Sequence, residues 1–503
     1  MTNSIAGLVG LALASAILYW QGITHRYPLA EGLLRLRLTW ASFDVSSRAG
    51  WAHAGIYGLL VLCYMLALRL AVRIPPRHVR TAIIVIASGW LLFSTSLLGA
   101  YPGESLDIFD YLVRGWMQAN YGVSPLETTP SAFPNQPFYD YHTWHNWVDA
   151  YGPLWEYPSG MVARAVGALS PGRLENYIAG YRLLAIMMAG VCGVLIYLIV
   201  GRSSPEHTAG ALVAWLWNPL LLMSTAVGAH NDGIMLAFIL VALLLVQRER
   251  WLLGILALGL AAHVKVTALL LLPVMGLWLV RRRGWRHALA ISAVALAFLA
   301  PLSWALYAPL GGWQTLPRML RERAILTTNS PANIVYDLLR ERWNWPPTPA
   351  RHAAIRGATL LFLVLAAGPL LRQWQQTRLT TENGAFWRGG IAMIMTYLIV
   401  GCFWFQAWYV MWVLALAALL PAGRFTLLLM PLFSLGALWS NISTDFLSHT
   451  GPHRLRPIEI DSIMVATLLT PMVCVLLVPA LWRIFRRPHT LEPAPANEST
   501  FSM

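Results

Sequence analysis

The chain has 503 residues, of which 57% are hydrophobic and only 12% are charged. A soluble protein would carry about twice that share of charged residues, so the composition excludes a string of soluble domains. The net charge of +14 could suggest nucleic-acid binding. However, the basic residues cluster between apolar runs, the positive-inside pattern of membrane proteins. We therefore expect a membrane partner and no nucleic acid. The clusters lie at 69–80, 248–250, 281–286, 372–378 and 483–487.

The first apolar stretch, Ile5 to Trp20, follows no basic segment and shows no clear small-residue cleavage site. This favours a retained first span over a removed signal. The cysteines stand singly inside apolar runs, which is typical of small buried side chains and predicts neither a structural disulfide nor a zinc site. They are Cys63, Cys192, Cys402 and Cys474.

Apolar runs of roughly 15–22 residues recur along the chain, and they fit helices that cross the hydrocarbon core. We predict an all-α polytopic membrane protein with about fourteen transmembrane helices and both termini in the cytoplasm. Residues 24–50 would then lie outside despite four arginines, as an amphipathic helix on the membrane surface would allow. The predicted spans are about 5–23, 51–73, 81–100, 178–200, 207–227, 233–247, 251–262, 264–280, 287–307, 352–372, 388–404, 406–420, 425–440 and 461–482.

Three outer segments between these spans are long, at 101–177, 308–351 and 441–460. Structureless loops of this length are uncommon unless they are functional, so we expect short helices on the outer face. The chain is predicted to be a single transmembrane domain over 1–487. Residues 488–503 are rich in Pro, Ala, Ser and Glu and are expected to form a disordered cytoplasmic tail.

The stretch from Trp251 to Val280 has basic residues on both flanks. Both flanks are expected in the cytoplasm, so the segment must leave that side and return. Its helix would reach about 45 Å, too little for two crossings of about 30 Å each. We predict two short helices with a vertex near His263 and Lys265. A lysine buried at that depth is a candidate functional residue; in one tilted helix it would only extend to the interface.

An acidic cluster follows the third predicted span, in the sequence Tyr101-Pro-Gly-Glu-Ser-Leu-Asp107-Ile-Phe-Asp110-Tyr111. At the mouth of a membrane bundle, such carboxylates are candidates for general-base catalysis. The simpler alternative is a helix cap or a solvated loop carboxylate.

Other polar segments are expected at the same outer level. Tyr151-Gly-Pro-Leu-Trp155 closes the large loop, and Gln406-Ala-Trp408-Tyr409 marks another outer turn, although an interfacial aromatic belt would also explain the latter. His230-Asn231-Asp232 precedes the sixth span, where Asn231 or Asp232 could cap the helix, serve a site, or do both.

A possible metal site is suggested only weakly. His142 and His145 lie near Asp140 and Asp149, but an HxxH spacing alone is a poor signal. We expect no metal and no cofactor.

The combined chemistry suits glycosyl transfer from a lipid-linked phosphate donor at the membrane surface. Asp107 would remove the proton of an acceptor hydroxyl. Lys265, with His263, would hold the departing phosphate as a point charge. Direct displacement with a single base inverts the anomeric carbon, whereas retention would need a carboxylate nucleophile.

These segments resemble the GT-C superfamily of membrane glycosyltransferases. Within it they are most similar to the polyprenol-phosphate-mannose-dependent α-1,6-mannosyltransferases and to glycosyltransferase family 87. The resemblance covers residues from about 100 to 415. It implies a GT-C fold, a polyprenyl-phospho-sugar donor, an inverting mechanism, and Asp107 as the base. Related sequences often carry a small polar residue at the position of Asp110, and Pro is expected where this chain has Ala407. The matching segments are Asp107–Tyr111, Tyr151–Trp155, Asn218–Asp232, His263–Lys265 and Phe405–Trp412.

The expected function is therefore transfer of a sugar, with mannose the expected one, to a hydroxyl of a glycan or glycolipid acceptor at the extracytoplasmic face of the plasma membrane. Besides the base Asp107, the expected donor-phosphate or lipid residues are Lys265, His263 and His230. The expected substrate-binding residues are Asp110, Tyr111, Tyr151, Asn231, Asp232, Gln406, Trp408 and Tyr409.

The alternative from another class is a transporter or flippase of lipid-linked sugars. Transporters tend to show paired repeats, and this sequence shows no internal repeat. An oligosaccharide ligase with a lipid-diphosphate donor and a purely structural scaffold also remain open. The sequence leaves the sugar, acceptor and linkage unidentified.

Overall fold

The computed structural model describes residues 3–35, 39–379, 384–450 and 455–485. Over these ranges the chain forms helices, and two isolated bridges are the only β pairings. The all-α prediction is confirmed. The tail predicted at 488–503 lies outside the described residues.

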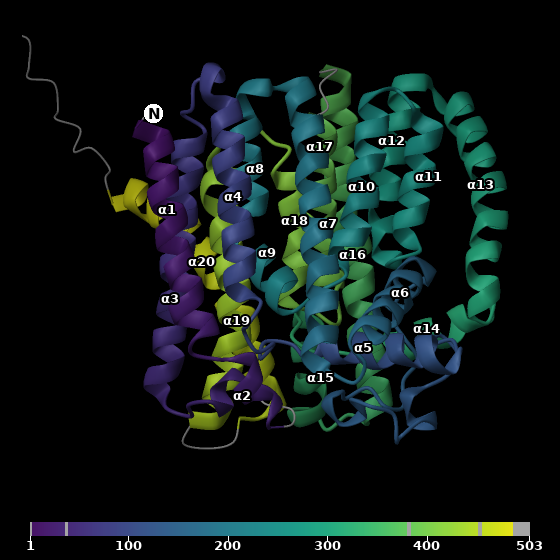
Figure 1. The fold of residues 1–503 in the computed structure, drawn as a ribbon. Helices are drawn as coiled ribbons and strands as arrows, with labels where there is room; N and C mark the ends of the chain where they lie inside the picture. The colour runs from purple at the N-terminus through teal and green to yellow at the C-terminus, as the bar shows by residue number, and fades with distance from the viewer. Residues whose placement is uncertain (1–2, 36–38, 380–383, 451–454, 486–503) are drawn as a thin grey trace, which may run out of the picture.

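Long helices stand side by side, and several short helices lie at the lower end of the view in Figure 1. The upper end carries the N-terminal end of α1 (Figure 1). The helices at the lower end are α2 (Leu29–Leu33), α5 (Asp107–Trp116), α6 (Pro153–Leu169), α14 (Thr315–Ala324) and α15 (Pro331–Glu341).

Eight helices in the described ranges are long and apolar enough to cross a membrane, or nine if one bent pair forms a span. The chain is therefore a multi-pass membrane protein. The number of about fourteen is not confirmed, because several predicted spans form apolar helices of only 10–17 residues. The long helices are α1 (Asn3–Tyr19), α3 (Ser47–Ala71), α4 (Val79–Leu97), α7 (Leu174–Ser203), α13 (Trp285–Tyr307), α16 (Pro347–Leu379), α19 (Met430–Thr450) and α20 (Pro457–Phe485); the shorter ones include α10 (Asp232–Gln247), α11 (Trp251–Ala262), α17 (Gly384–Thr396) and α18 (Val410–Ala417).

The predicted span 207–227 is bent by 49° between α8 (Thr208–Leu216) and α9 (Pro219–Leu222). Pro219 opens α9, and the side chain of Asn218 accepts a 2.9 Å hydrogen bond from the Leu220 N–H. A proline cannot continue the preceding helix, and an Asn at this position starts a new one. Asn218-Pro219 therefore turns one apolar run into two helices.

The predicted hairpin of two short helices is confirmed. α11 is followed by a 3₁₀ turn at Val266–Leu271, and α12 (Leu272–Arg283) then leads to the basic residues Arg281 to Arg283. The vertex packs on the start of α6, since the N–H of Gly152 donates to Val264 O at 3.0 Å. A Cβ at Gly152 would lie 2.2 Å from His263 O, so only glycine permits this approach.

The outer segments 101–177 and 308–351 carry the short helices expected of them, namely α5, α6, α14 and α15. Helix α19 continues past residue 441, where the third outer segment is predicted to begin, and ends at Thr450. Buried Ile442 and Phe446 keep this extension packed, and Asp445 accepts a hydrogen bond from the Ala41 N–H at 2.9 Å.

The described part of residues 24–50 carries α2, a 3₁₀ turn at Trp40–Ser42 and the start of α3, in place of the long amphipathic helix that would allow these residues to lie outside. The segment instead folds back onto the bundle, where the indole N–H of buried Trp40 donates to Tyr101 O at 2.8 Å. This contact holds the chain that leads into α5.

The bundle has a peripheral side and an interior. In the most apolar 18-residue stretch of Trp285–Leu310, only 6% of the residues are buried. The corresponding share for Phe425–His449 is 61%. Figure 1 accordingly shows α13 at the right edge of the bundle. α10 and α18 are buried along most of their length, and the candidate site lies at their N-terminal ends.

Candidate active site

The chain before α5 is tightly held, which fixes the position of Asp107. The buried guanidinium of Arg182 donates to Leu98 O at 2.6 Å, Ala100 O at 2.7 Å and Val227 O at 3.0 Å. Arg182 thus links the segment before α5, which contains Leu98 and Ala100, to the segment before His230, which contains Val227. Asp107 is the first residue of α5, where the positive end of the helix dipole favours a carboxylate.

Lys265 projects from the hairpin vertex into the same region. Its Nζ lies 2.7 Å from Asp232 Oδ1, 5.0 Å from the centre of the Tyr151 ring and 5.5 Å from that of Tyr409. Asp232 also accepts a 2.6 Å hydrogen bond from the Trp412 indole. An ammonium has three N–H donors, so one acidic partner leaves donor capacity for a ligand.

A cavity of about 480 Å³ connects these groups, within the ~300–1,000 Å³ usual for ligand pockets. Asp107 and Lys265 both line it. The other sequence-predicted residues in its wall are Asp110, Tyr151, Gln406, Trp408 and Tyr409. One cavity thus collects side chains from α5, the start of α6, the hairpin vertex and the turn before α18.

Three predicted residues lie directly behind this wall. The hydroxyl of Tyr111 lies 3.3 Å from that of Tyr151 and 3.3 Å from His230 Nδ1. The imidazole of His230 stacks on Trp408, with ring centres 3.7 Å apart. Asp232 is buried and contacts two residues of the wall, Lys265 and Trp412. These residues support the wall and do not form it.

His263 and Asn231 are not brought to the cavity. His263 Nδ1 lies 2.8 Å from Gly259 O, and its ring is 6.0 Å from that of Tyr307, so it turns back along α11. The capping role considered for Asn231 and Asp232 is wrong. Asn231 precedes α10 without a side-chain cap bond, and the Asp232 carboxylate is engaged by Lys265 and Trp412.

The electrostatics of Asp107 suit a base. Burial raises the pKa of its carboxyl to about 7, and the Asp110 carboxylate adds to the rise, while Lys265 and Arg323 oppose it. A general base works best with a pKa near the working pH. Asp107 can therefore be ionised at neutral pH and still accept a proton effectively.

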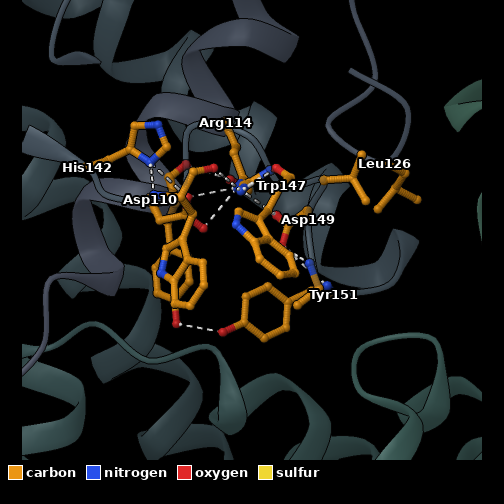
Figure 2. A network of polar contacts seen from close by, with 12 residues as sticks. Asp110, Arg114, Leu126, His142, Trp147, Asp149 and Tyr151 are labelled. Carbon is orange, nitrogen blue, oxygen red and sulfur yellow. Dashed lines mark hydrogen bonds and ion pairs between the residues drawn. The ribbon is translucent and has the colours of Figure 1, made fainter. Parts of the chain in front are cut away.

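Asp110 belongs to a buried ion network, shown in Figure 2, that consists of Asp110, Arg114, His142 and Asp149. Arg114 Nε is 2.9 Å from both Asp110 oxygens and 3.9 Å from Asp149 Oδ2, and His142 Nδ1 is 3.2 Å from Asp110 Oδ1. Burial would raise the pKa of Asp110, but Arg114 and His142 outweigh it and lower the pKa to about 2.

The network also shapes the large outer loop. The Arg114 guanidinium donates to Trp147 O at 3.0 Å, and Asp149 Oδ1 accepts a 3.3 Å hydrogen bond from the Tyr151 N–H. Charges that neutralise one another inside the protein thus hold the chain that presents Tyr151. In the described part of the chain, no three His, Cys, Asp or Glu side chains are placed to hold a metal ion, and His142 serves this network.

Sequence reasoning missed several residues of the cavity wall. Arg323 comes from α14, with its guanidinium 5.5 Å from the centre of the Trp144 ring and donating to Val148 O at 2.9 Å. Nothing distinguished it among the many arginines of the outer segments. Glu104 also lines the cavity, and its place in the acidic cluster before Asp107 is the sequence signal for it. A further signal was available for Lys265, which is the only lysine in the sequence.

Two family models match the chain. The model described as alpha-(1->6)-mannopyranosyltransferase, N-terminal domain, matches residues 4–281, more than half of the chain. The model of glycosyltransferase family 87 matches residues 158–431. Between them the two models span every residue of the cavity described above.

Curated relatives agree with these models. The chain is 27% identical over 448 residues to alpha-(1->6)-mannopyranosyltransferase A of Mycobacterium tuberculosis, covering 84% of this chain and 82% of that protein. It is also 27% identical over 180 residues to alpha-(1->6)-mannopyranosyltransferase A of Corynebacterium glutamicum, covering 35% of each protein. Alpha-(1->6)-mannopyranosyltransferase B of Corynebacterium glutamicum is 27% identical to the chain over 226 residues. This match covers 40% of this chain and 36% of the relative.

Proposed function

The chain belongs to the alpha-(1->6)-mannopyranosyltransferase family and is a membrane glycosyltransferase, and from this we propose that it moves a mannosyl residue from a polyprenyl-phosphate donor to a hydroxyl of a glycan or glycolipid. The observation that carries the proposal is the shared cavity, which exposes a carboxyl of raised pKa and a buried ammonium to one ligand. The mannosyl group and the 1→6 linkage are taken from the names of the relatives.

In the proposed reaction, the Asp107 carboxylate takes the proton of the acceptor hydroxyl as its oxygen attacks the anomeric carbon. The bond from that carbon to the phosphate oxygen breaks, and polyprenyl phosphate leaves with the bonding electrons. A single displacement inverts the anomeric configuration. The ammonium of Lys265 holds the phosphate as a point charge.

Arg323 is the second cation of the cavity and can share the charge of the leaving phosphate. Asp232 keeps Lys265 paired when no donor is bound, which limits the cost of burying its charge. With two cations facing a monophosphate, the proposed reaction requires no divalent metal.

The proposal places this chemistry on the extracytoplasmic side. The basic connections α3–α4, α10–α11 and α12–α13 lie at the upper end in Figure 1, and the helices around the cavity lie toward the lower end. Basic connections remain in the cytoplasm. A cysteine at Ser131, which is exposed in the segment between α5 and α6, should therefore react with an impermeant thiol reagent in intact cells, whereas one at exposed Glu206 should not. The reverse pattern would contradict the proposed side.

The deciding experiment incubates purified protein with radiolabelled polyprenyl-phospho-mannose, -glucose or -arabinose and a panel of hydroxyl acceptors, with and without a chelator. We expect transfer from the mannose donor, unaffected by the chelator, and a product anomer opposite to that of the donor. Transfer from a nucleotide sugar alone, or from none of the lipid donors, would contradict the proposal.

A further inference from the structure

A second cavity, of about 350 Å³, adjoins the active cavity. The two share Glu104 and Gln406 in their walls. The remainder of the second wall comes from the segments around Trp40 and Asn329 and from one end of α19 and α20. None of the residues identified from the sequence, apart from Gln406, lies in this cavity.

The lining of the second cavity is mostly polar. Its polar members besides Glu104 and Gln406 are Thr39, Asn329, Asn441, Thr444, Asp445 and Ser448. Within the described part of the chain, the side-chain amides of Gln406 and Asn441 form no hydrogen bond, so both can donate to and accept from a ligand. Such a wall does not suit a polyprenyl chain.

The charged residues of this lining disfavour anionic ligands. It contains the carboxyl groups of Glu104 and Asp445 and neither lysine nor arginine. A phosphate or carboxylate would meet these groups without a compensating cation. A neutral, hydroxyl-rich ligand would instead find acceptors and amides, with Ile442, Ile460 and Met464 as apolar surface for its C–H faces. That chemistry describes uncharged sugar residues.

The position of the second cavity relative to Asp107 indicates which substrate would bind there. Glu104 precedes Asp107 by three residues, and both line the active cavity. The cation-bearing wall, with Lys265 and Arg323, belongs to the active cavity and not to the second one. A ligand in the second cavity therefore reaches Asp107 past Glu104 and Gln406 without crossing the phosphate-binding side.

We propose that the second cavity binds neutral sugar residues of the acceptor glycan, and that Glu104, Gln406 and Asn441 position the acceptor so that its terminal hydroxyl meets Asp107. The inference rests on the proposed function. It adds a ligand class, an uncharged oligosaccharide, and a binding surface formed by α19 and α20. Glu104 and Asn441 act as positioning residues, since the proton is taken by Asp107.

Two variants test this surface. Asn441→Leu removes the amide at nearly constant size, and Ser448→Trp fills the cavity from an exposed position. The matched control is Ser443→Ala, on the same helix but outside the lining. Equilibrium binding of α-1,6-mannobiose to each full-length, donor-free protein is measured first. The acceptor and donor KM values are then determined with polyprenyl-phospho-mannose.

We expect wild type and Ser443→Ala to bind mannobiose equally, and both cavity variants to bind it at least about tenfold more weakly. Their acceptor KM should rise by a similar factor while the donor KM stays within about twofold. Unchanged binding in both variants, equal loss in the control, or no binding by the wild type would overturn the inference. Intact mannobiose binding without any transfer from lipid donors would instead count against the proposed function alone.

Discussion

Two groups of charged side chains lie next to each other around α5, and they differ in how fully the protein satisfies them. In the buried ion network, Arg114 holds Asp110 with two 2.9 Å contacts, and His142 adds a third. In the active cavity, Asp107 faces open volume, and Lys265 has a single acidic partner. Asp107 and Asp110 are the same residue type and stand only three residues apart in the sequence. Their surroundings give the first a raised pKa and the second a lowered one.

This difference indicates that the two groups of charged residues have different roles. Charges that neutralise one another within the protein fix the backbone that carries Tyr151. In the active cavity, Asp107 and Lys265 keep hydrogen-bonding capacity that a substrate can use. This comparison predicts that variants of the two groups fail in different ways, one in chemistry and the other in stability.

The largest catalytic effect is expected for Asp107→Asn, which removes the base. Transfer should fall by ~10²–10⁴-fold, with expression and donor binding largely intact. Because the pKa of Asp107 is raised in the folded protein, its ionisation costs stability as the pH rises through about 7, so the variant should unfold no more readily than wild type at pH 8. Steady-state rates and thermal unfolding check both parts.

The control for that variant is Asp140→Asn, in the same outer loop but exposed and outside the cavity. It should keep wild-type activity. Equal activity in Asp107→Asn and wild type would remove the basis of the enzymatic proposal.

The largest stability effect is expected for Arg114→Met, which leaves Asp110 and Asp149 buried without their cation. Breaking such a pair typically costs about 3–5 kcal/mol, so the melting temperature in detergent should fall markedly. Arg318→Met is the comparison, since Arg318 forms a 2.9 Å pair with Glu322 while 45% exposed. It should cost under about 1 kcal/mol. Equal melting temperatures would show that the network is not structural.

An intermediate effect is expected for Lys265→Ala. A charged hydrogen bond contributes about 1.5–3 kcal/mol, and each 1.4 kcal/mol is roughly tenfold in affinity. The donor KM should therefore rise by about 10- to 100-fold, with less change in the acceptor constant. Lys265→Arg should restore binding only in part, because a planar guanidinium does not replace a compact ammonium. An acceptor-specific defect would contradict the assignment.

The smallest effect concerns pH. Asp107 must be ionised to act as a base, so kcat/KM should fall tenfold per pH unit below about 7 and level off above it. Asp110 is ionised well below this range and should add no second step above about pH 3. Activity measured between pH 5 and 9 checks the profile. A flat profile through pH 7 would exclude Asp107 as the titrating base.

Much of the architecture followed from the sequence because its causes are local. Apolar length predicted the helices, and basic flanks around Trp251 to Val280 predicted the hairpin with Lys265 at its vertex. Roles that depend on a distant partner were harder to predict. Asn231 occupies the N-cap position of α10 but makes no side-chain capping bond, and His263, two residues from Lys265, packs against Tyr307 instead of the cavity.

The sequence by itself determined that the protein is helical, lies in the membrane, and carries an acid and a lysine next to outer turns, since hydropathy and charge act along short stretches of chain. Only the tertiary structure decided which polar groups meet. Trp412 and Asp232 are 180 residues apart yet hydrogen-bonded, and Arg323 reaches the cavity from a separate outer helix. The physical reason is packing: a side chain's partners depend on helix rotation and crossing, which no local pattern specifies.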